Sequence, residues 1–183
     1  MNIKTTTLEG CFIIEPKVFD DERGYFFESF HRKKFQELTG IKTQFVQDNE
    51  SMSQRGVLRG LHFQTGKFAQ SKLVRVIKGS VLDVAVDLRK DSSTFGKYFS
   101  IILSEKNKFQ LFIPRGFAHG FVVLEDDTIF SYKCDNNYNK LAEDGVMYDD
   151  PDLQIDWNLS KDKMIISEKD KNLSSFKEYC LQP

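Results

Sequence analysis

The stretch Arg-Gly-Leu-His-Phe-Gln, residues 59–64, contains one of only three histidines in the chain, at positions 31, 62 and 119. An imidazole titrates near neutral pH, so it can take up and return protons where most side chains cannot. Alone, this stretch is typical of an ordinary surface strand. A second stretch, Ile-Pro-Arg-Gly-Phe-Ala-His-Gly-Phe at 113–121, repeats the combination of arginine and histidine on a segment that also favours β-structure. Together the two stretches predict the walls of one pocket.

Short apolar and aromatic runs, separated by polar turns, predict an antiparallel sandwich or barrel. The expected strands are 11–14, 25–30, 44–49, 57–64, 72–77, 81–88, 98–103, 110–113, 119–124 and 128–134. Residues 78–80 read as the turn of a hairpin between the strands at 72–77 and 81–88. Two peripheral helices are expected, at 31–39 with Gly40 at its end and at 174–181 with Ser175 and Glu178 spaced as a capping box. Residues 65–71, 90–97 and 136–157 read as loops.

Alternation along the strands places particular polar residues on shared faces. Gln47 and Asn49 lie on one face of their strand. In the strand at 81–88, Asp83 shares a face with Val81 and Ala85, so it is either a wall of the pocket or part of a solvated strand face. These two interpretations of Asp83 are equally consistent with the sequence.

Composition limits the function classes. The 183 residues suffice for a single domain, residues 1–183, and 26 Lys and Arg against 27 Asp and Glu do not support a nucleic-acid surface. Three widely spaced cysteines, at 11, 134 and 180, match neither a disulfide framework nor a zinc site. No apolar run is long enough to cross a membrane, and the N-terminal residues do not resemble a signal peptide. A cytoplasmic protein without a membrane partner is therefore expected.

The predicted jelly roll and the pattern Pro-x-Gly-x-x-His, at Pro114, Gly116 and His119, suggest a cupin. Metal-binding cupins usually carry His-x-His followed by Glu, whereas this chain has His62-Phe63-Gln64 at the corresponding place. A phenylalanine ring does not ligate a metal, so no metal is expected.

Several motifs, in the same order along the chain, resemble the dTDP-4-dehydrorhamnose 3,5-epimerase family of nucleotide-sugar epimerases. They are Phe-x-Asp-x-Arg-Gly-Tyr-Phe-x-Glu at 19–28, Gln-Asp-Asn at 47–49, Arg-Gly-x-Leu-Arg-Gly-Leu-His-Phe-Gln at 55–64, Pro-Arg-Gly-Phe-Ala-His-Gly-Phe at 114–121, Tyr-Lys-Cys at 132–134 and Ser-Glu-Lys-Asp at 167–170. The resemblance extends from about residue 10 to about residue 176. It implies an all-β cupin-type jelly roll, a homodimer and a cofactor-free isomerase acting on a nucleotide-diphosphate sugar.

The resemblance also implies roles in proton transfer. His62 matches the general base, Asp170 the carboxylate that orients it, and Tyr132 the acid that returns a proton from the opposite face. Lys72 matches the cation beside the 4-keto oxygen of the substrate. Without the resemblance, Tyr132 would be taken for a packed core residue and Asp170 for a solvated carboxylate.

The resemblance implies that further residues bind the ligand, some of them from the neighbouring subunit of the homodimer. They fall into three groups: Arg23, Arg59 and His119 for the diphosphate and sugar; Phe26, Glu28, Gln47 and Asn49 for the nucleotide and its base; and Tyr138, Glu143 and Lys169 for the thymine ring and further contacts.

The implied reaction converts dTDP-4-dehydro-6-deoxy-D-glucose to dTDP-4-dehydro-L-rhamnose by epimerisation at C3 and C5. A carbonyl at C4 makes the protons at C3 and C5 removable, and no hydride moves. Accordingly, no Gly-x-Gly-x-x-Gly follows a strand. The alternatives are epimerisation at C3 alone, action on a GDP- or CDP-linked sugar, a non-catalytic sugar-binding cupin and a metal-dependent cupin oxygenase.

Overall fold

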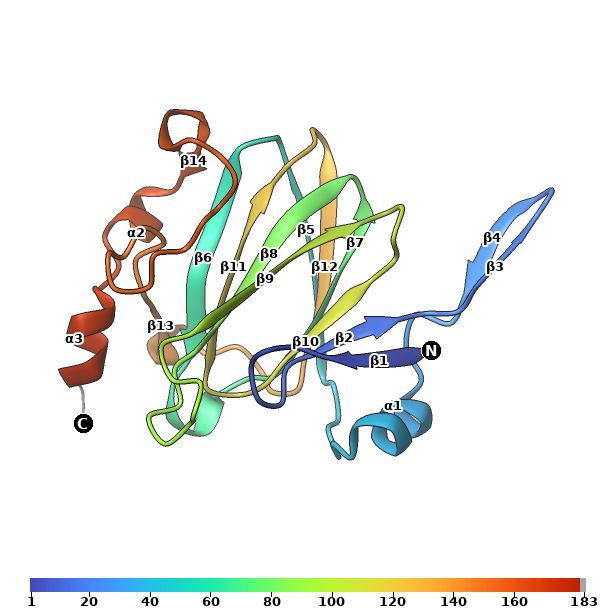
Figure 1. Ribbon diagram of the computed structural model, residues 1–183, viewed down its shortest axis with the longest axis horizontal. Coiled ribbons are helices and arrows are strands. Elements are labelled where there is room, and N and C mark those ends of the chain that lie inside the picture. Colours follow the sequence, from blue (N-terminus) through green and yellow to red (C-terminus); the bar gives the residue numbers. More distant parts are fainter. Residues whose placement is uncertain (182–183) are drawn as a thin grey trace.

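Two β-sheets packed face to face form the body of the protein in the computed structural model, which describes residues 1–181 (Figure 1). The first sheet has the order β1 (Asn2–Thr5), β2 (Phe12–Glu15), β10 (Gln110–Ile113), β7 (Lys72–Lys78), β12 (Thr128–Cys134) and β5 (Gln47–Ser53). The second has the order β13 (Glu143–Gly145), β6 (Val57–Gln64), β11 (Phe117–Val123), β8 (Ser80–Asp87) and β9 (Tyr98–Ser104), and β14 (Ile165–Ile166) pairs in parallel with β6. This arrangement confirms the predicted all-β jelly roll of cupin type.

Short helices lie at the periphery, as expected. They are α1 (Arg32–Thr39), η1 (Gly66–Phe68), η2 (Lys140–Ala142), η3 (Lys161–Lys163), α2 (Glu168–Lys171) and α3 (Phe176–Leu181). His31 caps α1 by accepting a hydrogen bond from the Lys34 amide, and Gly40 ends the helix in a left-handed conformation. The capping box of α3 is confirmed, because the Glu178 carboxylate accepts from the Ser175 amide at 2.7 Å and the Ser175 hydroxyl accepts from the Glu178 amide at 3.2 Å. None of the helices within residues 1–181 has the length and hydropathy needed to cross a bilayer.

Strand β8 is buried on both faces and organises the core. Its inner face carries Val81 and Ala85 into the cluster between the sheets, where they meet Val74 and Phe130 of the first sheet. Its outer face packs under the C-terminal segment that contains Trp157. Burial of alternating apolar residues on both faces is the main favourable contribution to folding, at roughly 25 cal/mol per Å² of apolar surface.

Asp83 lies on the inner face of β8 and is fully buried. The interpretation of Asp83 as part of a solvated strand face is therefore wrong. Within residues 1–181, Asp83 does not line the pocket either, but lies behind its wall and pairs with His119, which does line it.

The hairpin predicted at 78–80 is also wrong. Strand β7 pairs with β10 and β12 in the first sheet, whereas β8 pairs with β9 and β11 in the second. Gly79, with φ of 77°, turns the chain from one sheet to the other. A short glycine-containing turn between two apolar strands has the same sequence pattern whether the two strands pair with each other or enter different sheets. The difference depends on the other strands with which they pair, and these lie far away in the sequence.

The remaining differences between the expected and the observed strands lie in elements at the edges of the sheets and in the projecting hairpin. Strands β1 and β3 (Val18–Asp21) were not predicted, the strand expected at 25–30 is β4 (Gly24–Phe27), and the strand expected at 44–49 is shifted to β5. Strands β1 and β3 are mostly exposed, so their burial gives little alternation, whereas β5 does alternate and only its bounds were misplaced. The β3–β4 pair forms a hairpin that projects away from the two sheets (Figure 1).

We expect Gly79→Ala to destabilise the protein more than Gly40→Ala. Both glycines have a left-handed φ, which costs a non-glycine residue about 1–2 kcal/mol. A Cβ at Gly79 would also lie 2.2 Å from Thr128 Oγ1, whereas Gly40 faces open space. Overpacking adds about 1–3 kcal/mol. Urea unfolding of the two variants measures the difference, and equal losses would contradict a tight corner at Gly79.

Candidate active site

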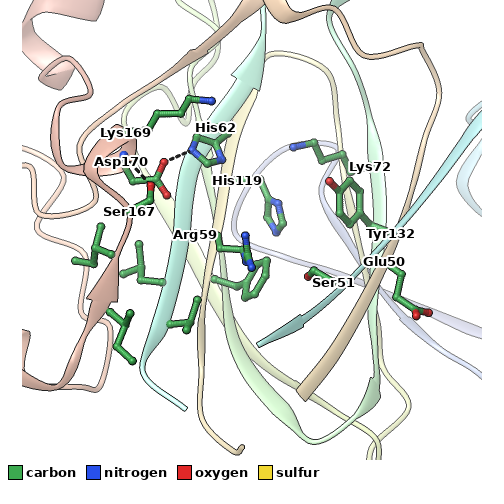
Figure 2. Close-up of a pocket in the computed structure, with 15 residues that line it drawn as sticks. Glu50, Ser51, Arg59, His62, Lys72, His119, Tyr132, Ser167, Lys169 and Asp170 are labelled. Atoms are coloured by element: carbon green, nitrogen blue, oxygen red, sulfur yellow. Dashed lines mark hydrogen bonds and ion pairs between the residues drawn. The ribbon is translucent and has the colours of Figure 1, made fainter. Parts of the chain in front are cut away.

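A cavity of about 550 Å³ opens between the two sheets and is closed on one side by the C-terminal segment (Figure 2). The two histidines of the predicted pocket meet here, because His62 on β6 and His119 on β11 are register partners on neighbouring strands. Arg59 also lines the cavity and donates a hydrogen bond to Ser53 Oγ at 3.2 Å. Arg115 does not reach the cavity and pairs instead with Asp135.

His62 is paired with a carboxylate from the other end of the chain. Its Nε2 lies 2.7 Å from Asp170 Oδ1, and the Gly60 amide donates to Asp170 Oδ2 at 3.3 Å. Burial favours the neutral form of this carboxyl, but the hydrogen bonds and the charge of His62 outweigh it and hold the pKa of Asp170 below its ordinary value. The structure thus brings together the two residues that the resemblance implied as base and orienting group.

Ser167 places Asp170 and was not singled out from the sequence. Its hydroxyl accepts a hydrogen bond from the Asp170 amide at 3.1 Å and so caps the short helix α2. The spacing Ser-x-x-Asp before Lys171 is a helix-start signal that could have identified this contact.

Lys72 and Tyr132 occupy the opposite wall, on β7 and β12 of the first sheet, and face the two histidines (Figure 2). The Lys72 ammonium lies 5.8 Å from the centre of the Tyr132 ring. Burial lowers the pKa of Lys72 and raises the pKa of Tyr132 from their ordinary values. Tyr132 also packs against Phe130, so it belongs both to the core and to the cavity wall.

His119 is paired in the same way as His62 but more deeply. Its Nε2 lies 2.9 Å from Asp83 Oδ2, and both side chains are almost fully buried. Burial lowers the pKa of His119 despite the neighbouring carboxylate, so the imidazole is neutral at pH 7.

A smaller cavity of about 100 Å³ shares His62, Lys72 and Tyr132 with the first and extends the site. It is lined by further predicted ligand residues: Gln47, Asn49, Tyr138 and Glu143. These residues are joined by hydrogen bonds from Gln47 Nε2 to Asn49 Oδ1 at 2.9 Å, from the Tyr138 amide to Gln47 Oε1 at 2.9 Å, and from the Tyr138 hydroxyl to Glu143 Oε2 at 3.0 Å. Lys169, which lines the larger cavity, forms an ion pair with Glu143.

Three predicted ligand residues lie outside both cavities, on or beside the projecting hairpin. Arg23 pairs with Asp21, and Phe26 is 71% exposed. Glu28 pairs with Lys34 at 2.9 Å. Within one chain, the structure therefore does not bring Arg23, Phe26 and Glu28 to the site.

Ser51 lines the cavity and was not predicted to do so. It follows Gln47 and Asn49 at the same period of two along β5, so extending the alternation by one step would have found it. The other lining residues that gave no such signal are Glu50, Val57, Leu58, Phe121, Ile165 and Ile166.

Residues 1–181 contain no group of three or more His, Cys, Asp or Glu side chains that could hold a metal ion. Phe63, which stands where a second metal-binding histidine would be, packs its ring 5.6 Å from that of Tyr179. The donor set of this site therefore does not fit the metal centre of a cupin oxygenase.

Comparison with known proteins gives a consistent result over almost the whole chain. The family model for dTDP-4-dehydrorhamnose 3,5-epimerase matches residues 5–178. The dTDP-4-dehydrorhamnose 3,5-epimerase of Methanothermobacter thermautotrophicus is 55% identical over 174 residues, which cover 94% of this chain and 93% of the relative.

Two solved structures are also similar. The crystal structure of dTDP-4-dehydrorhamnose 3,5-epimerase from Elizabethkingia anophelis NUHP1 is 58% identical with a TM-score of 0.94, and the match covers 97% of each chain. That of dTDP-6-deoxy-D-glucose-3,5-epimerase from Legionella pneumophila Philadelphia 1, in complex with dTDP-4-keto-L-rhamnose, is 48% identical with a TM-score of 0.93. This match covers 100% of the present chain and 94% of the other.

Proposed function

Because this chain belongs to the dTDP-4-dehydrorhamnose 3,5-epimerase family, we propose that the cavity between its sheets inverts two carbons of a bound sugar with His62 as the base and Tyr132 as the acid. The protein is an isomerase that converts dTDP-4-dehydro-6-deoxy-D-glucose to dTDP-4-dehydro-L-rhamnose. One observation carries the assignment of roles. The His62–Asp170 pair and the Tyr132 hydroxyl lie on opposite walls of one cavity, so a sugar ring between them would meet a base on one face and an acid on the other (Figure 2).

The proton transfers follow from the contacts. His62 takes a proton from the carbon next to the 4-keto group, and the electron pair of the broken C–H bond moves onto the keto oxygen as an enolate. Asp170 stabilises the imidazolium that forms, and the Lys72 ammonium stabilises the enolate oxygen. Tyr132 then delivers its hydroxyl proton to the opposite face of the same carbon. Its raised pKa keeps the phenol protonated at neutral pH, and exchange with solvent restores both groups.

His62→Asn tests the base. The variant keeps hydrogen-bonding capacity but removes the proton acceptor, so we expect loss of inversion and of deuterium uptake at both C3 and C5, with nucleotide binding kept. Proton NMR of the substrate in deuterated water measures both centres. His31→Asn is the matched control, because asparagine also caps a helix and His31 lies outside the cavity. Uptake at the wild-type rate by His62→Asn would show that another group is the base.

Tyr132→Phe separates the two proton-transfer roles. The variant loses only the hydroxyl, so the enolate still forms but His62 can return a proton only to the face it came from. We expect continued deuterium exchange with inversion reduced by roughly 10²–10⁴-fold, the usual contribution of a general acid. Exchange and inversion are read by NMR in one sample. Tyr179→Phe, which removes a hydroxyl bonded to the Leu88 carbonyl away from the cavity, should change neither. Joint loss in Tyr132→Phe would contradict a role confined to proton return.

We also propose that the protein is a homodimer in which the projecting hairpin of each subunit supplies Arg23, Phe26 and Glu28 to the site of its partner. The support is that these residues match ligand positions of the family yet lie away from their own cavity. Phe19, Tyr25 and Phe26 of this hairpin are all more than half exposed, and such a cluster of exposed aromatic rings favours contact with a partner surface.

Mixing two inactive variants tests this arrangement. Arg23→Ala damages the hairpin and His62→Asn damages the cavity. In a mixed dimer with exchanged hairpins, one of the two sites has both an intact hairpin and an intact base. Half of randomly assembled dimers are mixed, so we expect recovery of about a quarter of wild-type activity after co-expression. No recovery above the separate variants would place each hairpin over its own cavity.

A further inference from the structure

The site contains two neighbouring histidine–aspartate pairs, His62–Asp170 and His119–Asp83. The proposed proton transfers use only the first pair. His62 and His119 are register partners on β6 and β11, and each imidazole uses Nε2 to contact a carboxylate. The pairs differ in burial. The His62 side chain is 27% exposed, whereas that of His119 is 7% exposed and its partner Asp83 is fully buried.

We propose that Asp83 is a positioning residue that holds His119 as the neutral tautomer with its proton on Nε2, so that Nδ1 accepts a hydrogen bond from a hydroxyl group of the bound sugar. This inference rests on the proposed function, because it assumes that a sugar occupies the cavity. It assigns His119 to the sugar and not to the diphosphate, since an unprotonated ring nitrogen repels a phosphate oxygen and attracts a hydroxyl hydrogen.

The geometry places the proton. An ionised carboxylate only accepts hydrogen bonds, so the 2.9 Å contact with Asp83 Oδ2 requires a proton on His119 Nε2. Within residues 1–181, Nδ1 has no hydrogen-bond partner, and it is not among the fully buried unpaired atoms, so it is accessible from the cavity that His119 lines. The ring plane is held by Phe130, stacked at 6.1 Å, and by Phe121 at 6.3 Å.

The surrounding charges explain why a neutral ring suits this position. The titratable groups that face His119 are Asp83, Lys72 and His62. A charged His119 would place a second cation beside Lys72 and would oppose formation of the imidazolium at His62 during proton abstraction. Burial and these two neighbours instead keep the pKa of His119 below its ordinary value. The two pairs therefore have different roles. His62 gains a proton during the reaction, whereas His119 stays neutral with its proton on Nε2.

Nitrogen-15 NMR of histidine-labelled protein tests the tautomer without any substrate. The chain has only three histidines, so the His119 signals are assigned by comparison with His31→Gln and His119→Gln. We expect a protonated Nε2 and an unprotonated Nδ1 for His119 from pH 7 to pH 8. A proton on Nδ1 over this range, in either the neutral or the charged ring, would overturn the proposal.

Asp83→Asn tests the consequence for binding. Unlike the carboxylate, the side-chain amide that this substitution introduces has a donor that can bond to Nε2, which favours the tautomer with the ring proton on Nδ1, where it faces the sugar hydroxyl with a second donor. We expect the affinity for dTDP-glucose, a non-reacting ligand with ring hydroxyls, to fall by roughly tenfold, and the affinity for dTDP to change less than about twofold. Calorimetry measures both, and the nitrogen-15 pattern of the variant should show the moved proton. Equal losses for the two ligands, or none for dTDP-glucose, would refute a role in sugar recognition.

Asp87→Asn is the matched control, because Asp87 is a fully buried carboxylate on the same strand and face. Asp87 bonds to Arg89, Ser92 and Thr94 and does not line the cavity. We expect Asp87→Asn to lower stability without changing the ratio of dTDP-glucose to dTDP affinity.

The outcomes for this inference and for the proposed function are distinguishable. Wild-type protein that does not exchange or invert at C3 and C5 contradicts the epimerase roles, whatever the state of His119. The tautomer of His119 in the free protein decides the role of Asp83 even if Asp83→Asn fails to fold.

Discussion

The hydrogen bond between His62 Nε2 and Asp170 Oδ1, 2.7 Å long, joins the strand at the centre of the site to a segment more than a hundred residues later in the chain. The same segment is held to β6 by the parallel pairing of β14 and by the hydrogen bond from the Ile165 amide to the Gly56 carbonyl at 2.8 Å. Because Ile165, Ile166 and Ser167 also line the cavity, the segment that brings Asp170 to His62 is also part of the cavity wall.

The turn at Gly79 sends two consecutive strands, β7 and β8, into the two sheets that face each other across the cavity. At Gly79 the chain leaves the first sheet, which carries Lys72, and enters the second, which carries Asp83. A hairpin at this point would have put both strands in one sheet and both residues on one side. The crossing instead puts Lys72 across the cavity from the strands of His62 and His119, on the same wall as Tyr132.

Charge in the site is concentrated in a nearly neutral protein. The chain carries a net charge of −1, yet Lys72, Asp83 and Asp170 all lie at least half-buried around one cavity. Separated from water, such charges interact more strongly than they would at the surface, and each needs a partner. Asp170 has His62 and the Gly60 amide, whereas Asp83 has His119 on one oxygen, and its Oδ1 has no hydrogen-bond partner within residues 1–181. The two imidazoles therefore differ in their partners: the carboxylate beside His62 has a second hydrogen bond from the backbone, and in the described part of the chain the carboxylate beside His119 does not.

The sequence by itself determined the elements with strong local patterns. Alternation and turn residues located most core strands, the cap residues located α1 and α3, and the ordered motifs located the family and many, though not all, residues of the cavity. The substitution of a second metal ligand by Phe63 was also visible without a structure. Only the tertiary structure decided that β7 and β8 enter different sheets at Gly79, that Asp83 pairs with His119, and that the hairpin with Arg23 and Phe26 projects away from the two sheets. The physical reason is that a period of two records which side of a strand is buried, whereas the partner of that side is chosen by contacts between segments distant in the chain.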